Sequence, residues 1–545
     1  MWPAAGDTGR TIVPGVTGGN PPSAPQARLC APDAASRRIQ PVSSFPEVPV
    51  RRLSGAAAQL TQLLSRRGRL STIDAATAAP PPSPLAPVDL TDPRQVSGIM
   101  DLAARIGDIL LSAGTGNTDA KAQIHTVASA YGLHYCHVDI TFNTITVFTH
   151  VGDFRDHPIS IFRVVGKLSL DFSKLQEVDK LIRSIRMGQT TPSQAEARLD
   201  TIMAAPPPYG YLTSLAGWAV MTGAVAVLLG GNLVVTVIST LSAVVIMHGF
   251  TILGKQGLPD FFKNIFGGVV ATVPAALTYQ WALINDYEIT PSQIVASGIV
   301  AMLAGLTLVQ SLQDGITGAP VTASARFFDT ILLTGGIIAG VGLGIQLAGA
   351  LDISLPPLET AAAGPVASPG VKVISGAIAS AGFAVALYAD WSSVLVAGLT
   401  AAAGSGFYYF VCLPMDVGPV AGLGAAATII GLAGGLLARR FLIPPLITAV
   451  AGITPLLPGL AIYRGMYAVL HDQMLLGFAN LALALAIGSA LAAGVVLGEW
   501  IARKIRRPRP ADWYRHLVHG RRSLFTDSNR RTDIAGRTDY HHGSY

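Results

Sequence analysis

Four ionisable side chains stand within a long apolar region and are the first candidates for chemistry. Between Tyr211 and Trp500, only 18 of 290 residues are Asp, Glu, Lys or Arg. Burying a charge in a lipid bilayer costs about 2.5–3.5 kcal/mol or more, so such residues usually serve a function or pair with one another. The candidates for a transport or coupling role are Asp314, Arg326, Asp329 and Arg464.

Asp329 and Arg464 carry the most specific expectation. We predict that both face the interior of a helix bundle, Asp329 with Arg326 one turn earlier. A carboxylate can alternate between protonated and ionised states, as proton antiport requires, whereas arginine keeps its charge at accessible pH. A structural ion pair is the alternative for Asp329 and Arg464, and an interfacial anchor is the alternative for Arg326.

A second set of residues is typical of interrupted helices. The ninth of the apolar segments described below contains Pro455, Pro458 and Gly459, and an earlier segment at 310–318 contains Gly315 and Gly318. Helix breaks expose backbone groups, which is tolerable at membrane depth only where those groups line a cavity or are buried in protein. We therefore predict that these five residues belong to helix breaks at a substrate site.

Other motifs indicate neither a nucleotide, a metal nor a cofactor. Residues 249–255 resemble a Walker A loop, but Gln256 replaces the Ser or Thr that would bind magnesium, and the segment ends an apolar helix. His134 and Cys136 alternate with His137 and Asp139 along a predicted strand, so the two pairs face opposite ways. We expect no cofactor and no metal site, and no Gly-x-Ser-x-Gly or HExxH motif is present.

The elements that must position these residues are predicted membrane spans. The chain has 545 residues, of which 50% are hydrophobic and 13% charged, about half the charged share of a soluble domain. Since a spanning helix needs about 20 apolar residues, we predict ten spans, with nine or eleven as alternatives because prolines interrupt the ninth. They are 211–230, 233–253, 262–284, 290–309, 326–350, 371–389, 392–412, 417–438, 444–470 and 474–498.

The predicted domain organisation follows from these spans. A Pro- and Arg-rich tail covers 1–92, in which 50–73 has the composition of either a basic amphipathic helix or a solvated stretch. A small α+β domain is expected at 93–205. Two membrane halves of five spans each occupy 206–350 and 351–500, and a basic tail covers 501–545.

In the α+β domain, alternation predicts strands at 134–140, 144–150 and 159–164. Helices are predicted at 100–111, 172–187 and 192–203, and Thr118 is expected to cap a further helix that ends near Tyr131.

Charge placement predicts the orientation of the chain. Lys255, Lys263, Arg326 and the pair at 439–440 fall in alternate loops together with the basic tail, whereas the opposite loops hold mainly acidic residues. Because cytoplasmic loops collect Lys and Arg, both termini are predicted to be cytoplasmic.

The segments 310–318 and 457–465 are similar, and each precedes the last span of its half. Five spans are an odd number, so two such halves would be inverted across the membrane, an architecture typical of secondary transporters. Glycines four residues apart, at Gly336, Gly340 and Gly344 and at Gly494 and Gly498, predict close helix packing.

Three of these segments resemble the bacterial threonine/serine exporters, the ThrE family. They are Ser112-Ala113-Gly114-Thr115 before a helix, residues 313–326, and the Leu-Pro-Gly-Leu-Ala-Ile-Tyr-Arg-Gly run at 457–465; the likeness covers about 95–500. The resemblance implies a multi-pass protein of the bacterial plasma membrane that exports threonine and serine in exchange for protons or another coupling ion. It implies no nucleic-acid partner; a homo-oligomer stays open.

Two alternatives accompany this interpretation. In one, the chain is a membrane-anchored hydrolase whose 93–205 domain is catalytic, with the turn Ser112–Asn117 in its site. In the other, that domain regulates a transporter of other small metabolites.

Overall fold

We analysed a computed structural model of the chain, which describes residues 89–505 except 152–156, 167–170, 303 and 354–366. The predictions for 1–88, including Cys30 and the basic segment 50–73, and for most of the basic C-terminal tail lie outside the described residues.

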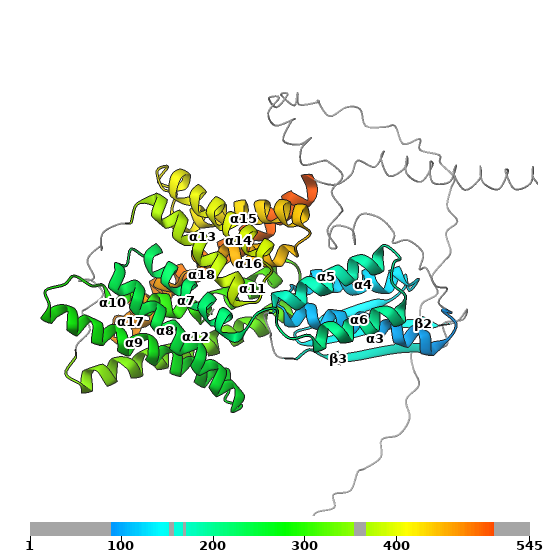
Figure 1. The fold of residues 1–545 in the computed structure, drawn as a ribbon, viewed down its shortest axis with the longest axis horizontal. Helices are drawn as coiled ribbons and strands as arrows, with labels where there is room; N and C mark the ends of the chain where they lie inside the picture. The colour runs from blue at the N-terminus through cyan, green and yellow to red at the C-terminus, as the bar shows by residue number, and fades with distance from the viewer. Residues whose placement is uncertain (1–88, 152–156, 167–170, 303, 354–366, 506–545) are drawn as a thin grey trace, which may run out of the picture. The chain divides into compact units, whose positions relative to one another are not determined.

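The N-terminal domain is a three-stranded antiparallel sheet covered by helices (Figure 1). Its strands follow in the order β1 (His137–Thr141), β2 (Thr144–Val151) and β3 (His157–Val164). The helices are α3 (Pro93–Ser112), α4 (Asn117–Ala130), α5 (Phe172–Arg186) and α6 (Pro192–Ala204). The α+β prediction is therefore confirmed.

Local sequence explains where these helices begin. Asp92 caps α3, the Asp171 carboxylate accepts from two backbone N–H groups of α5, and Thr191 forms a capping box with Gln194 in α6. The predicted cap at Thr118 is wrong, because α4 begins one residue earlier and its N-cap is Gly116.

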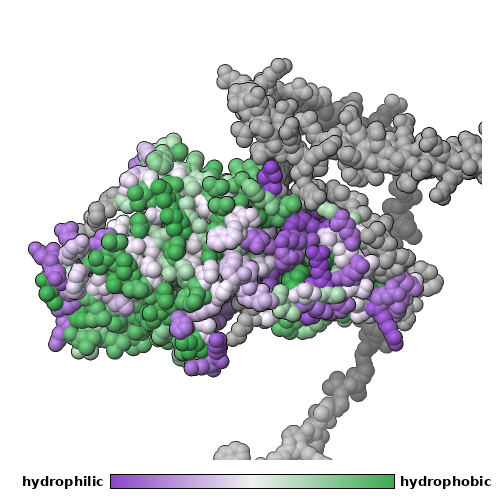
Figure 2. Space-filling view, in the orientation of Figure 1, coloured by the Kyte–Doolittle hydropathy of each residue, from purple (hydrophilic) through white to green (hydrophobic). Residues whose placement is uncertain are grey.

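Within the described residues, eight helices are long and apolar enough to cross a membrane, or ten if each of two bent helix pairs counts as one span. The eight are α7 (Tyr211–Leu228), α8 (Leu233–Lys255), α9 (Asp260–Ile284), α12 (Pro320–Ala350), α13 (Pro369–Ala386), α14 (Trp391–Phe407, continued by a π-helix to Cys412), α15 (Pro419–Phe441) and α18 (Met474–Ile505). Apolar side chains cover much of the visible surface of this part, whereas polar ones gather over the N-terminal domain (Figure 2).

The bent pairs lie where the fourth and ninth spans were predicted. The first joins α10 (Pro291–Ala301) to α11 (Ala304–Ile316) at 51°, and the second joins α16 (Pro445–Ile453) to α17 (Gly459–Leu470) at 48°. A short 3₁₀ turn, Thr454–Leu456, precedes the second bend. The predicted fourth span, 290–309, is therefore interrupted after Ala301, and its second helix continues to Ile316.

The predicted glycine contacts are confirmed. A Cβ added to Gly336 would come within 2.6 Å of the Phe261 carbonyl oxygen of α9, and one on Gly344 within 2.7 Å of Thr272. Gly494 and Gly498 lie in the same way against the backbone of α15. Only glycine lets these helix backbones approach so closely, so α9 packs tightly against α12, and α15 against α18.

Candidate functional site

A buried ion pair joins the end of α11 to the start of α12. Arg326 Nη1 lies 2.7 Å from Asp314 Oδ2, and the Asp314 residue is only 1% exposed. The second oxygen, Oδ1, accepts from the backbone N–H of Asn117 at 3.2 Å. Asn117 is the first residue of α4, so the carboxylate also meets the positive end of a helix dipole.

Further hydrogen bonds fix the N-terminal domain at this point. The Thr322 hydroxyl oxygen accepts from Asn117 Nδ2 at 2.6 Å and from the Phe142 N–H at 3.0 Å. The Thr118 hydroxyl donates to the Thr317 carbonyl at 3.1 Å. The turn between α11 and α12 is therefore held by the N-terminal domain as well as by its own ion pair.

Helix α5 docks on the second membrane half. Arg183 Nη1 donates to the Leu442 carbonyl at 3.0 Å, and the Phe172 N–H donates to the Leu387 carbonyl at 2.9 Å. Gln176 donates to the Ser393 hydroxyl and accepts from the Asp390 N–H. The N-terminal domain thus contacts α11 and α12 as well as the ends of α13 and α15 and the start of α14.

Asp329 and Arg464 do not lie where the sequence suggested. Asp329 is exposed on α12, beside the exposed Phe328, because the buried stripe of this helix passes through Thr330 instead. Arg464 is exposed on α17, whose buried face carries Tyr463 and Tyr467. The expectation that both face the bundle interior is wrong, and Arg326 pairs with Asp314.

The structure places a helix break at the predicted prolines 455 and 458, while the role of these residues in a substrate site stays a prediction. Pro455 lies in the 3₁₀ turn, Pro458 is the N-cap of α17, and Gly459 is its first residue. Gly315 instead lies in the last turn of α11, and Gly318, with a φ of 96°, lies in the turn before α12.

The break of the first half comes earlier, after Ala301, where no proline marks it. The two breaks face each other across a close contact, because a Cβ on Gly459 would meet the Val300 side chain of α10 and would lie 3.3 Å from the Ala296 carbonyl oxygen.

Across the described part of the chain, no three His, Cys, Asp or Glu side chains are grouped so that they could hold a metal ion. Burial raises the pKa of the Cys136 thiol, which makes it a poor nucleophile. The turn proposed for a hydrolase is also closed, since Thr115 and Asn117 are 6% and 4% exposed.

Comparisons with known proteins find related sequences over most of the chain. A family model described as "Putative threonine/serine exporter" matches residues 101–348, and a second, "Threonine/Serine exporter, ThrE", matches 372–501. The "Threonine/serine exporter" of Corynebacterium glutamicum is 62% identical over 461 residues, which cover 85% of this chain and 94% of that protein. The "Probable threonine/serine exporter" of Mycobacterium tuberculosis is 36% identical over 75% of this chain and 77% of its own length. No solved structure matches.

Proposed function

The chain belongs to the ThrE family of threonine/serine exporters, and from this premise we propose that it exports L-threonine and L-serine across the bacterial plasma membrane by secondary transport. The proposed mechanism rests on the contact between the two broken helix pairs, where Gly459 of α17 packs against α10. Broken helices with exposed ends are typical of transporter substrate sites.

A zwitterionic substrate fits such ends. The N–H groups at the start of one half-helix attract a carboxylate, and the free carbonyls at the end of another attract an ammonium group. The threonine or serine hydroxyl needs only one further polar partner. Substrate recognition at the breaks therefore requires no cofactor and no buried charge.

The two membrane halves are proposed to be inverted repeats. Helices α10 and α16 begin at Pro291 and Pro445, and α12 and α18 begin at Pro320 and Met474, so both pairs of starts are 154 residues apart. The same packing partners recur: α9 with α12 and α15 with α18, α7 with α8 and α13 with α14. Five spans in each half, with each bent pair counted as one, would invert the second copy.

The coupling ion is proposed to be the proton. Antiport of one proton per zwitterion moves one net charge, which at roughly 150 mV supplies about 3.5 kcal/mol, enough for a gradient of about a hundredfold or more. Since Asp329 is exposed, Asp314 becomes the preferred proton carrier. It is the carboxylate that is buried at the end of a broken span.

Transport of labelled threonine into inverted membrane vesicles tests this function. We expect accumulation on energisation, its loss on adding an uncoupler, and competition by unlabelled serine. Vesicles from cells that lack the protein are the control, and accumulation that resists the uncoupler would contradict proton coupling.

A catalytic N-terminal domain has no comparable support. The turn Ser112–Asn117 that a hydrolase would use lies against α11 and α12, through Asn117 and its contacts with Asp314 and Thr322. The named relatives are exporters. A structural or regulatory role for this domain follows more directly from its contacts with both halves.

A further inference from the structure

One buried hydroxyl group beside the second helix break has no hydrogen-bond partner. Ser405, near the end of α14, is 0% exposed, and no described residue donates to its Oγ or accepts from it. A serine inside a helix often donates to the carbonyl three or four residues earlier, but Ser405 does not. A buried polar group without a partner costs free energy, so such groups normally meet a ligand or an ordered water.

Neighbouring hydroxyl groups of the same helices are paired instead. Ser380 of α13 and Thr400 of α14 both donate to the Ala397 carbonyl, at 3.0 Å and 2.9 Å. Thr454, in the 3₁₀ turn of the break, donates to a carbonyl of α16 at 2.9 Å. The unpaired hydroxyl of Ser405 is therefore specific to this position and not a general feature of the contact between these helices.

Ser405 lies close to the break, on either side of Gly376 of α13. A Cβ added to Gly376 would lie 2.9 Å from Ser405 Oγ and 3.6 Å from the Cβ of Pro455. The unpaired hydroxyl and the break therefore converge on one point of α13. Shortly after Ser405, α14 passes into the π-helix Tyr408–Cys412, and π-helical turns occur frequently at functional sites.

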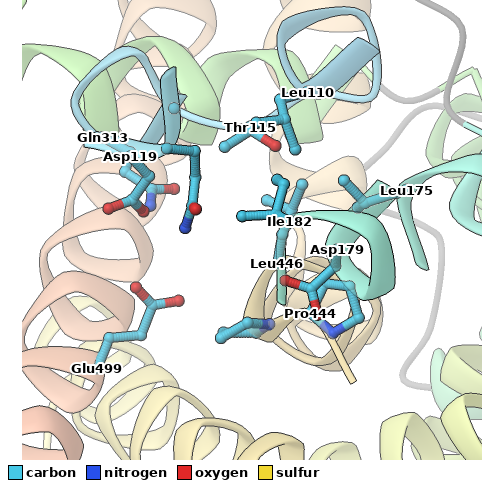
Figure 3. A pocket seen from close by; sticks show the side chains of 13 residues that line it. Leu110, Thr115, Asp119, Leu175, Asp179, Ile182, Gln313, Pro444, Leu446 and Glu499 are labelled. Carbon is cyan, nitrogen blue, oxygen red and sulfur yellow. The ribbon is translucent and has the colours of Figure 1, made fainter. Parts of the chain in front are cut away.

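The helices around Ser405 carry almost no charge. Helices α14 and α16 contain no Asp, Glu, Lys or Arg, and Lys372 of α13 lies over the ring of Tyr409. The start of α16 borders a cavity of about 40 Å³ whose three carboxylates each have an arginine partner (Figure 3). That cavity and the break are separated by the length of α16, about 14 Å. The group that fits Ser405 is therefore a neutral polar one.

We propose that Ser405 is the partner of the substrate's side-chain hydroxyl and selects threonine and serine over amino acids that lack this group. The inference rests on the proposed function, in which the ends of the broken helices hold the carboxylate and the ammonium group. A hydroxyl can both donate and accept, so it pairs with a second hydroxyl without any charge. Because Ser405 is fully buried, the substrate reaches it only when α13 and α14 move away from the break, as alternating access requires.

Selectivity then follows from desolvation. An amino acid without the hydroxyl displaces water from Ser405 but does not replace the lost hydrogen bond, so its binding is disfavoured.

Counterflow of labelled threonine in proteoliposomes that contain the purified full-length protein tests this selectivity. The competitors are unlabelled threonine and 2-aminobutyrate, which has a hydrogen atom in place of the hydroxyl. We expect threonine to compete about tenfold more strongly than 2-aminobutyrate in the wild type, and about twofold or less in Ser405→Ala. Ser405→Cys should give an intermediate ratio, because a thiol is a weaker hydrogen-bonding group.

Ser380→Ala is the matched control, because Ser380 is an equally buried serine at the same contact whose hydroxyl already has a partner. It should keep the wild-type ratio and lower the melting temperature slightly. Ser405→Ala should not lower the melting temperature, since the hydroxyl that it removes has no partner. An unchanged ratio in Ser405→Ala overturns the proposal; if that variant fails to fold, the ratio in Ser405→Cys decides in the same way.

Failure of the proposed function gives a different result. If the wild-type protein neither binds nor transports threonine and serine, the export proposal falls and the role of Ser405 falls with it. If wild-type transport of threonine is intact but 2-aminobutyrate competes equally well, only the hydroxyl site is wrong.

Discussion

Asp314 is a partner in a structural ion pair and also a candidate proton site. A single substitution of Asp314 would therefore affect both stability and proton coupling. Asp314→Asn removes the ion-pair partner of Arg326, whose side chain is 12% exposed, and should cost about 1–3 kcal/mol. We expect a lowered melting temperature together with loss of gradient-driven threonine accumulation. Counterflow and driven uptake in reconstituted vesicles measure the two transport modes separately.

The double variant Asp314→Asn with Arg326→Gln separates these effects. Removing both charges should restore much of the melting temperature, because neither ion is then left unpaired, while accumulation stays lost. Asp329→Asn, on the exposed face of the same helix, should accumulate threonine like the wild type. A double variant with normal accumulation would show that Asp314 is purely structural.

Substitution of the three cysteines should leave membrane insertion and transport intact. Cys136 and Cys412 are buried free thiols, and Cys30 lies outside the described residues. We expect the triple variant with Cys30→Ser, Cys136→Ala and Cys412→Ala to insert and transport, because no structural disulfide is involved. Membrane-fraction immunoblots and vesicle uptake check this, and loss of the protein from the membrane would reveal a cysteine-dependent fold.

At the scale of elements, adjacent glycines of α12 give a matched pair of variants. Gly336 lies against the Phe261 carbonyl of α9, whereas a Cβ on Gly335 would meet nothing within 4 Å. Gly336→Ala should force α9 and α12 apart and destabilise the protein by about 1–3 kcal/mol, while Gly335→Ala should be close to neutral. Thermal melts in detergent measure the difference, and equal melting temperatures would contradict this packing.

The two helix breaks differ in whether the amino-acid sequence predicts them. Prolines at 455 and 458 mark the second break because proline removes a donor and clashes with the preceding turn. The first break has no proline. It forms where α10 packs among α7, α8 and α17, and these contacts depend on residues distant in sequence.

At the scale of the molecule, the orientation of the chain remains a prediction. If both termini are cytoplasmic, a reporter fused after Asp286 should report outside and one fused after Gly257 should report inside. Fusions after residues 360 and 510, outside the described residues, should report outside and inside. These outcomes follow from the placement of Lys and Arg, and a C-terminal reporter found outside would refute the topology.

Local sequence patterns were enough to predict most of the helices and strands. Apolar runs of spanning length, strand alternation and capping residues are local signals, and the predicted spans and N-terminal elements match the observed helices and strands closely. The glycine spacing also predicted the tight pairs, because a four-residue repeat places every glycine on one face of a helix.

Which charges are buried, and which of them pair, depends on how the helices pack in the folded protein. Asp314 and Asp329 are both single carboxylates in apolar surroundings, and no local pattern distinguishes them. Asp314 is buried because Arg326 of α12 and the first N–H of α4, almost 200 residues earlier in the chain, converge on it. Burial of a charge depends on partners that only folding brings together, since desolvation must be offset by contacts in space.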